Sequence, residues 1–149
     1  NMSSKYRYLL LLLLLFASFT VISRVTENKL SLSITDLRNN KGHVLISVYK
    51  DGVGYPEELD KAVRRAKLTI INKKATVSCA GLASGNYAIA ILHDENDDGK
   101  MNTNFLGLPK EGYGFSNNVM GTFGPPTFSK ASFQYNANQI KSIVINTKY

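Results

Sequence analysis

Residues 93–107, HDENDDGKMNTNFLG, concentrate acidic side chains in an otherwise basic chain. Four of the first six residues of this stretch are Asp or Glu, whereas the whole chain has 18 Lys and Arg against 11 Asp and Glu. Carboxylate, amide and carbonyl oxygens in a tightly turned loop are the ligands that Ca²⁺ prefers. This stretch therefore predicts a cation-binding loop, and without the cation its four carboxylates are expected to repel one another and leave the loop loose.

The spacing within the stretch matches that of known calcium loops. Asp94, Asn96 and Asp98 fall at the first, third and fifth positions, where alternate side chains converge on one point. Gly99 falls at the sixth position, where a sharp turn requires glycine. Glu95, at the second position, is expected to point away from the ion.

Two departures separate this loop from a helix-loop-helix calcium site. The residue before it belongs to an expected strand, and the twelfth position is Phe105 instead of a bidentate Glu. Glu111 is a candidate for the missing carboxylate. The alternative is a solvated turn that holds itself by hydrogen bonds from side chains to the backbone. The predicted ligands are Asp94, Asn96, Asp98, the Lys100 carbonyl, Asn102 and Glu111.

A metal-dependent hydrolase with a site at His93, Asp94 and Glu111 is the enzymatic alternative. Catalytic transition-metal sites normally use about three protein ligands with more than one imidazole, and the other histidine, His43, begins a distant strand. His93 is therefore expected to cap its strand. The sequence contains no Ser-His-Asp order and no glycine-rich phosphate loop. A non-enzymatic module is the prediction.

The segment GLPKEGYGFSNN, residues 107–118, is a second candidate surface. Tyr113, Phe115 and Asn117 combine aromatic rings with an amide, a combination that suits a carbohydrate or a peptide. The alternative is that the two rings fold back and form a small core of the loop itself.

Apolar residues that alternate with polar ones predict β-strands, and these strands would position the candidate site residues. The first two expected strands are separated by the turn signal NNKG and are expected to form a hairpin. NYAIAILH, residues 86–93, is almost wholly apolar and is predicted to be a central strand. The seven expected strands cover residues 30–35, 43–49, 66–72, 75–80, 86–93, 128–136 and 139–149.

Seven strands with short turns predict an all-β, antiparallel sandwich, immunoglobulin-like or transthyretin-like in shape. Residues 56–65 are either a short helix opened by Pro56 or an irregular loop. Residues 94–126 show no periodicity but contain several aromatic residues, so they predict one long ordered loop.

The N-terminal segment has the layout of a secretory signal. Lys5 and Arg7 precede an uncharged, apolar run over residues 8–23, with small residues before a cleavage site after Ser23. Residues 1–23 are therefore predicted to be a signal peptide and 24–149 a single domain that is secreted or periplasmic. An uncleaved anchor is the alternative, and membrane contact is expected only through this segment.

The composition of the chain bears on its possible partners and on the role of its single cysteine. The net charge is +7, but the basic residues are scattered without a stripe of interleaved aromatics, so nucleic acid is not expected as a partner. The single cysteine, Cys79, alternates with Val77 and Ala75 and is predicted to be a buried structural thiol.

Residues 82–118 resemble an exported bacterial family known as a domain of unknown function (DUF2141). The resemblance implies a secreted β-sandwich and supplies no activity. Asn102 stands where the family usually has Asp, which should weaken a cation site. The matching residues are Gly85, Tyr87, Ala88, His93, Asp94, Asn96, Asp98, Gly99, Met101, Asn104, Gly107, Pro109, Glu111, Gly112, Gly114, Phe115, Ser116 and Asn117.

These observations together predict a non-enzymatic binding or structural module in which a Ca²⁺-type loop orders a long surface loop. The expected partner is a carbohydrate, a peptide or another envelope protein. A structural subunit of an envelope assembly, with residues 30–35 as an edge strand that pairs with a partner, is a further alternative.

Overall fold

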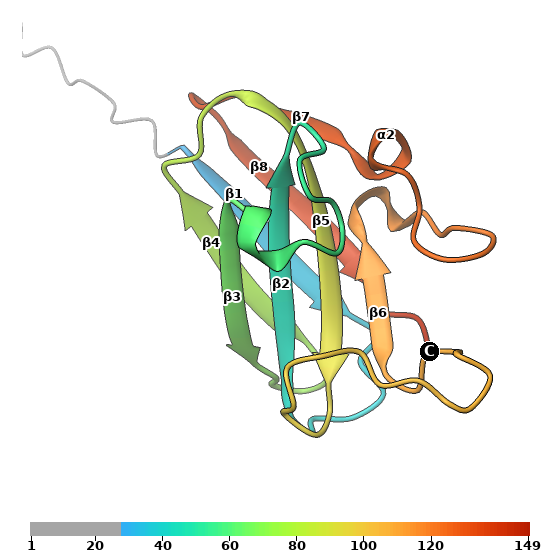
Figure 1. Ribbon diagram of the computed structural model, residues 1–149. Coiled ribbons are helices and arrows are strands. Elements are labelled where there is room, and N and C mark those ends of the chain that lie inside the picture. Colours follow the sequence, from blue (N-terminus) through green and yellow to red (C-terminus); the bar gives the residue numbers. More distant parts are fainter. Residues whose placement is uncertain (1–27) are drawn as a thin grey trace, which may run out of the picture.

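The computed structural model describes residues 28–149, and the predicted signal peptide lies outside these residues. The described chain forms two β-sheets that pack face to face, with almost no helix (Figure 1). The prediction of an all-β sandwich is confirmed, with eight strands in residues 28–149 instead of the seven expected. No helix in residues 28–149 is long and apolar enough to cross a membrane.

The smaller sheet has the strand order β4-β1-β8. Its central strand pairs with one neighbour in each orientation, antiparallel to β4 and parallel to β8. Leu30, Leu32 and Ile34 point into the core, and each is at most 2% exposed. The strands are β1 (Lys29–Thr35), β4 (Ala75–Ala80) and β8 (Ile140–Asn146).

The larger sheet has the order β3-β2-β5-β6, and β7 also pairs with β5. Strand β5 is hydrogen-bonded to β2 along one edge and to β6 and β7 along the other, so the prediction that it is central is confirmed. The strands are β2 (His43–Lys50), β3 (Arg64–Thr69), β5 (Gly85–Asp94), β6 (Gly112–Phe115) and β7 (Phe133–Tyr135).

Two apolar clusters hold the domain together. The main cluster lies between the sheets and combines the inward residues of β1 with those of β2 and β5, such as Ile46 and Ile89. A smaller cluster contains Ala88, Phe115 and Ala131. In β5, Ile89 and Ile91 belong to the main cluster, whereas Ala88 belongs to the smaller one and Ala90 packs against it. Apolar residues therefore cover both faces of this part of β5.

The predicted hairpin of residues 30–35 and 43–49 is wrong, because β1 and β2 belong to different sheets. Alternation requires only that one face meets a core, and the opposite sheet supplies that core here. Asp36, with a φ of 60°, and the buried Leu37 redirect the chain between the two sheets. Because β1 lies between β4 and β8, it is also not the predicted edge strand.

The irregular segments also differ from the expected ones. Residues 128–136 form a short helix, α2 (Phe128–Ala131), before β7, instead of one strand. Between Pro56 and β3 there are turns and a single 3₁₀ turn, η2 (Leu59–Lys61), so the irregular alternative holds there. Residues 94–126 contain β6 and the 3₁₀ turn η3 (Ser116–Asn118).

Cys79, predicted to be a buried structural thiol, is only partly buried. The side chain is partly buried against the main core cluster, and this burial raises the pKa of the thiol. A thiol with a raised pKa is a poor nucleophile at neutral pH.

Candidate functional site

The acidic loop begins where β5 ends, and its first carboxylate organises the turn that follows. Asp94 is 1% exposed, and its two carboxylate oxygens accept hydrogen bonds from the backbone N–H of Asp98 at 3.1 Å and of Gly99 at 2.9 Å. Gly99 has a φ of +80°, a conformation that L side chains rarely adopt. The sharp turn predicted at this glycine is therefore present.

Three further predicted ligands converge at the exposed side of the loop. Asp98 Oδ2 accepts hydrogen bonds from the amide of Asn96 at 3.1 Å and from the amide of Asn102 at 2.8 Å. The Asn96 amide also donates to Asn102 Oδ1 at 2.9 Å. Hydrogen bonding from Asn102, the largest contributor, lowers the pKa of Asp98. These side chains meet at one point, as the spacing predicts.

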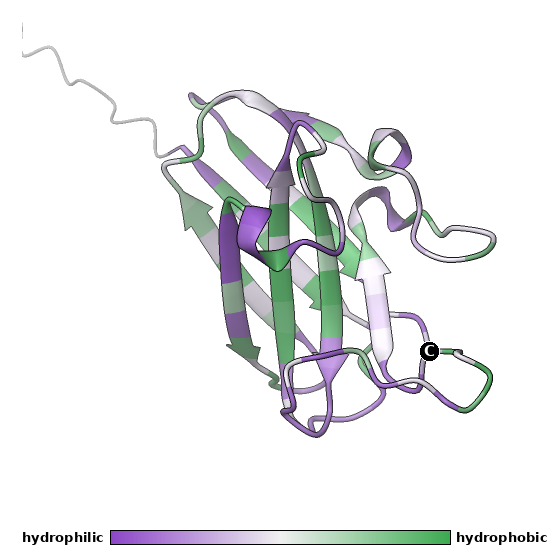
Figure 2. Cartoon of the chain, viewed as in Figure 1, coloured by the Kyte–Doolittle hydropathy of each residue, from purple (hydrophilic) through white to green (hydrophobic). Residues whose placement is uncertain are grey.

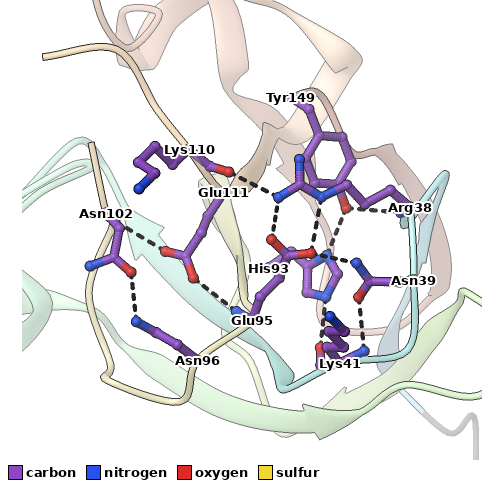
Figure 3. Close-up of polar contacts among 10 residues, drawn as sticks. All are labelled: Arg38, Asn39, Lys41, His93, Glu95, Asn96, Asn102, Lys110, Glu111 and Tyr149. Atoms are coloured by element: carbon purple, nitrogen blue, oxygen red, sulfur yellow. Dashed lines mark hydrogen bonds and ion pairs between the residues drawn. The ribbon is translucent and has the colours of Figure 1, made fainter. Parts of the chain in front are cut away.

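Glu111 joins the two ends of the loop. Its carboxylate is buried, 4% exposed, and accepts hydrogen bonds from the backbone N–H of Glu95 at 2.9 Å and of Asn102 at 3.0 Å (Figure 3). Glu111, the candidate for the missing carboxylate ligand, thus lies beside the loop, and its role as a cation ligand stays a prediction. Within residues 28–149, its two oxygens hold the backbone of the loop and form no hydrogen bond with the three converging side chains.

Glu95 points away from the convergence of the other acids. Its carboxylate accepts hydrogen bonds from Arg38 Nε at 3.0 Å and from Asn39 Nδ2 at 2.6 Å, and it also forms an ion pair with Arg38 Nη2. Hydrogen bonding from Arg38, the largest contributor, lowers the pKa of Glu95 to about 2. Glu95 is thus ionised through its own basic partner.

Asp97 also has its own basic partners. Its Oδ1 lies 2.6 Å from His43 Nδ1 and 3.1 Å from Lys67 Nζ, both from neighbouring strands β2 and β3. Hydrogen bonding from His43, followed by Lys67, lowers the pKa of Asp97. The four acids therefore face four different sets of partners, which differs from the expected group of mutually repelling carboxylates.

His93 is the centre of a buried hydrogen-bond network (Figure 3). It is 0% exposed, and Nε2 lies 2.8 Å from the Lys41 carbonyl oxygen, which can only accept. Nε2 therefore carries the proton, and Nδ1 accepts from the Tyr149 hydroxyl at 2.6 Å. That hydroxyl in turn accepts from the backbone N–H of Arg38 at 3.0 Å. Both ring nitrogens of His93 are hydrogen-bonded within the protein, as expected of a strand cap.

Tyr149 also connects this network to Glu95 and β6. Its ring lies under the Arg38 guanidinium, 4.5 Å from Cζ to the ring centroid. A Cβ atom on Gly112 would lie 2.5 Å from the Tyr149 ring, so glycine is required for this close approach. Burial raises the pKa of the Tyr149 hydroxyl above its ordinary value.

The sequence prediction missed Arg38, Asn39, Lys41 and Tyr149 in this network. Arg38 and Tyr149 are 111 residues apart, and no periodicity or motif links them. The turn signal NNKG contains Asn39 and Lys41, and it was the one available indication that this segment is ordered.

Of the predicted ligand-binding residues, Tyr113 and Phe115 lie in β6 and Asn117 lies in η3. Phe115 is 7% exposed and belongs to the smaller core cluster, and Tyr113 packs against it. The Asn117 amide donates to the carbonyl oxygens of Lys130 and Ser132 at 3.0 and 2.8 Å. The alternative reading, in which the two rings form a small core, agrees with this packing.

The potential ligands can be compared with those of known metal sites. In residues 28–149, no three His, Cys, Asp or Glu side chains form a group that could hold a metal ion. These four residue types do not include side-chain amides or backbone carbonyls, which are common ligands of Ca²⁺. Lys100 donates its N–H to Asp98 Oδ1 at 3.1 Å, which places its backbone beside the converging side chains.

The fold and this loop define an all-β sandwich with a self-hydrogen-bonded acidic loop at the end of its central strand. Comparison with protein families matches residues 32–143 to the family described as "Uncharacterized protein conserved in bacteria (DUF2141)". This match covers more than half of the chain, which therefore belongs to that family, as the resemblance predicts. Searches of curated proteins and of solved structures each gave no significant match.

Proposed function

We propose that this protein is a non-enzymatic, secreted or periplasmic module in which residues 94–102 bind a Ca²⁺-type cation. The observation that carries the proposal is the convergence of Asn96, Asp98 and Asn102. Two amide groups there direct N–H donors at a single carboxylate oxygen, Asp98 Oδ2. The protein supplies partial positive charge at the place where a cation would supply a full charge.

A cation can enter this arrangement with small side-chain movements. A half-turn of the Asn96 or Asn102 carboxamide exchanges its nitrogen for its oxygen, because the two ends of an amide have nearly the same shape. The same side chains then present oxygens beside Asp98. Asp94 retains acceptor capacity, since a carboxylate has about four lone-pair sites and the two backbone N–H groups use two.

The ligand chemistry favours calcium over other ions. All the candidate ligand atoms are oxygens, which suits a hard cation, and the loop mixes carboxylates with neutral amides. Magnesium requires a tighter octahedral site and dehydrates reluctantly. Because Asn96 and Asn102 carry no charge, we expect the weak affinity of extracellular calcium modules, with a dissociation constant of about 10⁻⁴ to 10⁻³ M.

The role proposed for the cation is to strengthen a surface that the fold already supports. Glu111 fastens both ends of residues 95–102, and Glu95 fastens the loop to Arg38. A bound ion would add stability to the first part of the long surface loop, residues 94–126. The proposed partner of that loop is a carbohydrate, a peptide or another envelope protein.

The hydrolase alternative has less support from the same geometry. Both ring nitrogens of His93 are used within the protein, and the side chain is fully buried. Both oxygens of Asp94 and of Glu111 accept backbone hydrogen bonds. A transition metal at these three residues would have to displace one of the two bonds of the buried His93 ring, whereas the calcium proposal displaces only exposed amide contacts.

Isothermal titration of metal-free protein with CaCl₂ tests the proposal. We expect one site in the stated affinity range, loss of binding in Asp98→Ala, and retained binding in the matched variant Glu95→Gln. Glu95→Gln also removes one carboxylate from the loop, but its side chain faces Arg38. Absence of calcium binding at millimolar concentration, or equal loss in both variants, would contradict the proposal.

A further inference from the structure

We infer that Phe105, Leu106 and Leu108, here called the apolar tip, insert into the interface of a phospholipid bilayer that contains anionic lipids. This contact is distinct from the one expected of the N-terminal segment. It also does not require the proposed cation site, because the exposure of these side chains is a property of the chain itself.

The apolar tip is unusually exposed for its composition. Phe105 is 94% exposed, Leu106 67% and Leu108 57%. Single exposed apolar residues are ordinary on protein surfaces, but three large ones within four positions form a patch that favours an interaction. Folding gains little from these side chains where they stand.

The backbone holds the apolar tip away from the domain. Asn104 Oδ1 accepts hydrogen bonds from the N–H of Leu106 at 2.9 Å and of Leu108 at 3.0 Å. The backbone N–H of Asn104 donates to the Leu108 carbonyl at 2.9 Å, and Lys110 donates to the Asn102 carbonyl at 2.8 Å. The tip is therefore a closed, hydrogen-bonded turn whose side chains are displayed without a further ordering step.

A second loop carries the same kind of residue. Phe123, in residues 119–126, is 100% exposed, and Met120 is 37% exposed. Both loops project from the same side of the sandwich, to the right in Figure 1, and their ends are hydrophobic in Figure 2. Two convex projections with bulky apolar ends suit a fluid bilayer better than a rigid protein surface, which requires a continuous complementary patch.

The charges beside the apolar tip complement an anionic surface. Lys100 and Lys110 flank it in sequence and both are exposed. Neither forms an ion pair within residues 28–149, although the charge of Lys100 also acts on the nearby carboxylate of Asp98. Lysines near a bilayer surface are attracted to anionic headgroups, while adjacent aromatic and leucine side chains enter the acyl boundary. The lysines lie on both sides of the apolar tip in the sequence, which is the arrangement that contact with an anionic bilayer needs.

A tryptophan at the tip would report insertion directly. The chain contains no Trp, so Phe105→Trp introduces a single tryptophan, whose emission can be excited selectively over that of the 8 Tyr. On addition of phosphatidylglycerol–phosphatidylcholine vesicles, we expect its emission to shift to shorter wavelength and to be quenched by lipids brominated in the acyl chain. An unchanged emission spectrum at saturating lipid would overturn the inference.

Vesicle co-sedimentation tests which residues are responsible. Phe105→Ser is expected to weaken binding about ten-fold or more, and Lys100→Glu with Lys110→Glu at least about five-fold for each lysine. Ile71→Ser is the matched control, because Ile71 is 68% exposed in the turn between β3 and β4. Equal loss in the control variant, or unaltered binding in Phe105→Ser, would overturn the inference.

Self-association is the competing explanation and has a different signature. If a second copy covered the apolar tip, Phe105→Trp emission would shift with protein concentration in the absence of lipid, and sedimentation velocity would show a dimer that Phe105→Ser abolishes. That result would overturn the bilayer inference. A monomer whose emission responds only to vesicles would support it.

Discussion

Glu111→Gln tests how the acidic loop is held. The wild-type carboxylate accepts two backbone hydrogen bonds, from Glu95 and Asn102, while 4% exposed. Hydrogen bonds to a charged acceptor contribute about 1.5 to 3 kcal/mol each. Glutamine keeps one acceptor oxygen at neutral strength and turns an N–H donor toward the other backbone N–H, which is left unsatisfied. We expect a loss of about 2 to 4 kcal/mol in the free energy of loop opening.

Native-state hydrogen exchange measures this loss at the two amides concerned. A change of 2 to 4 kcal/mol corresponds to about 30- to 1,000-fold faster exchange at Glu95 and Asn102, since 1.4 kcal/mol is a factor of ten. The control is Glu58→Gln, which neutralises an exposed carboxylate before η2. Unchanged protection of both amides in Glu111→Gln would refute the role assigned to this carboxylate.

Two other variants probe the buried network. The folded pKa of Glu95, about 2, lies below its ordinary value of 4.5, so the stabilisation is present above about pH 4.5 and is lost as the pH falls toward 2. Glu95→Gln should therefore flatten the decline of the urea-unfolding free energy over this pH range. At pH 7 it should lower that free energy by roughly 1 to 2 kcal/mol, a value reduced for solvent screening because Arg38 is half exposed. His93→Gln should cost about 1 to 3 kcal/mol in the same assay, because both ring nitrogens are bonded, and no zinc or iron should copurify with the wild type. Stoichiometric zinc that is lost in His93→Gln would contradict this.

The features that were predicted correctly depend on neighbouring residues. The spacing of Asp94, Asp98 and Gly99 fixes a local turn, and the structure shows its backbone hydrogen bonds and the positive φ of the glycine. The apolar run of residues 86–93 similarly gives the central strand β5. Such features require no knowledge of distant parts of the chain.

The features that were missed depend on distant pairing. Alternation in residues 30–35 shows which face of β1 is buried, but does not show that its partners are β4 and, in parallel, β8. β6 escaped prediction because two of its four residues are glycines, which give no apolar alternation. The contact of Tyr149 with His93 spans 56 residues and leaves no local pattern.

The sequence shows where the acidic residues cluster, but it does not show which groups face them in the fold. Clustering of acids suggested mutual repulsion that only a cation relieves. In the structure, Glu95 and Asp97 face Arg38, His43 and Lys67, which are supplied by other segments. The argument for a cation therefore depends on Asn96, Asp98 and Asn102 alone, and this is the point that a measurement must address.

The most direct test is the melting temperature of the wild type and of Asp98→Ala, each in 10 mM CaCl₂ and in chelator. At about ten times the dissociation constant, mass action stabilises the fold by about 1.4 kcal/mol. For a domain of this size, that corresponds to a rise of about 3 to 6 °C in the wild type. We predict this rise in the wild type and none in Asp98→Ala. An equal melting temperature with calcium and with chelator in the wild type would contradict the account, and the loop would then be a turn stabilised by its own hydrogen bonds.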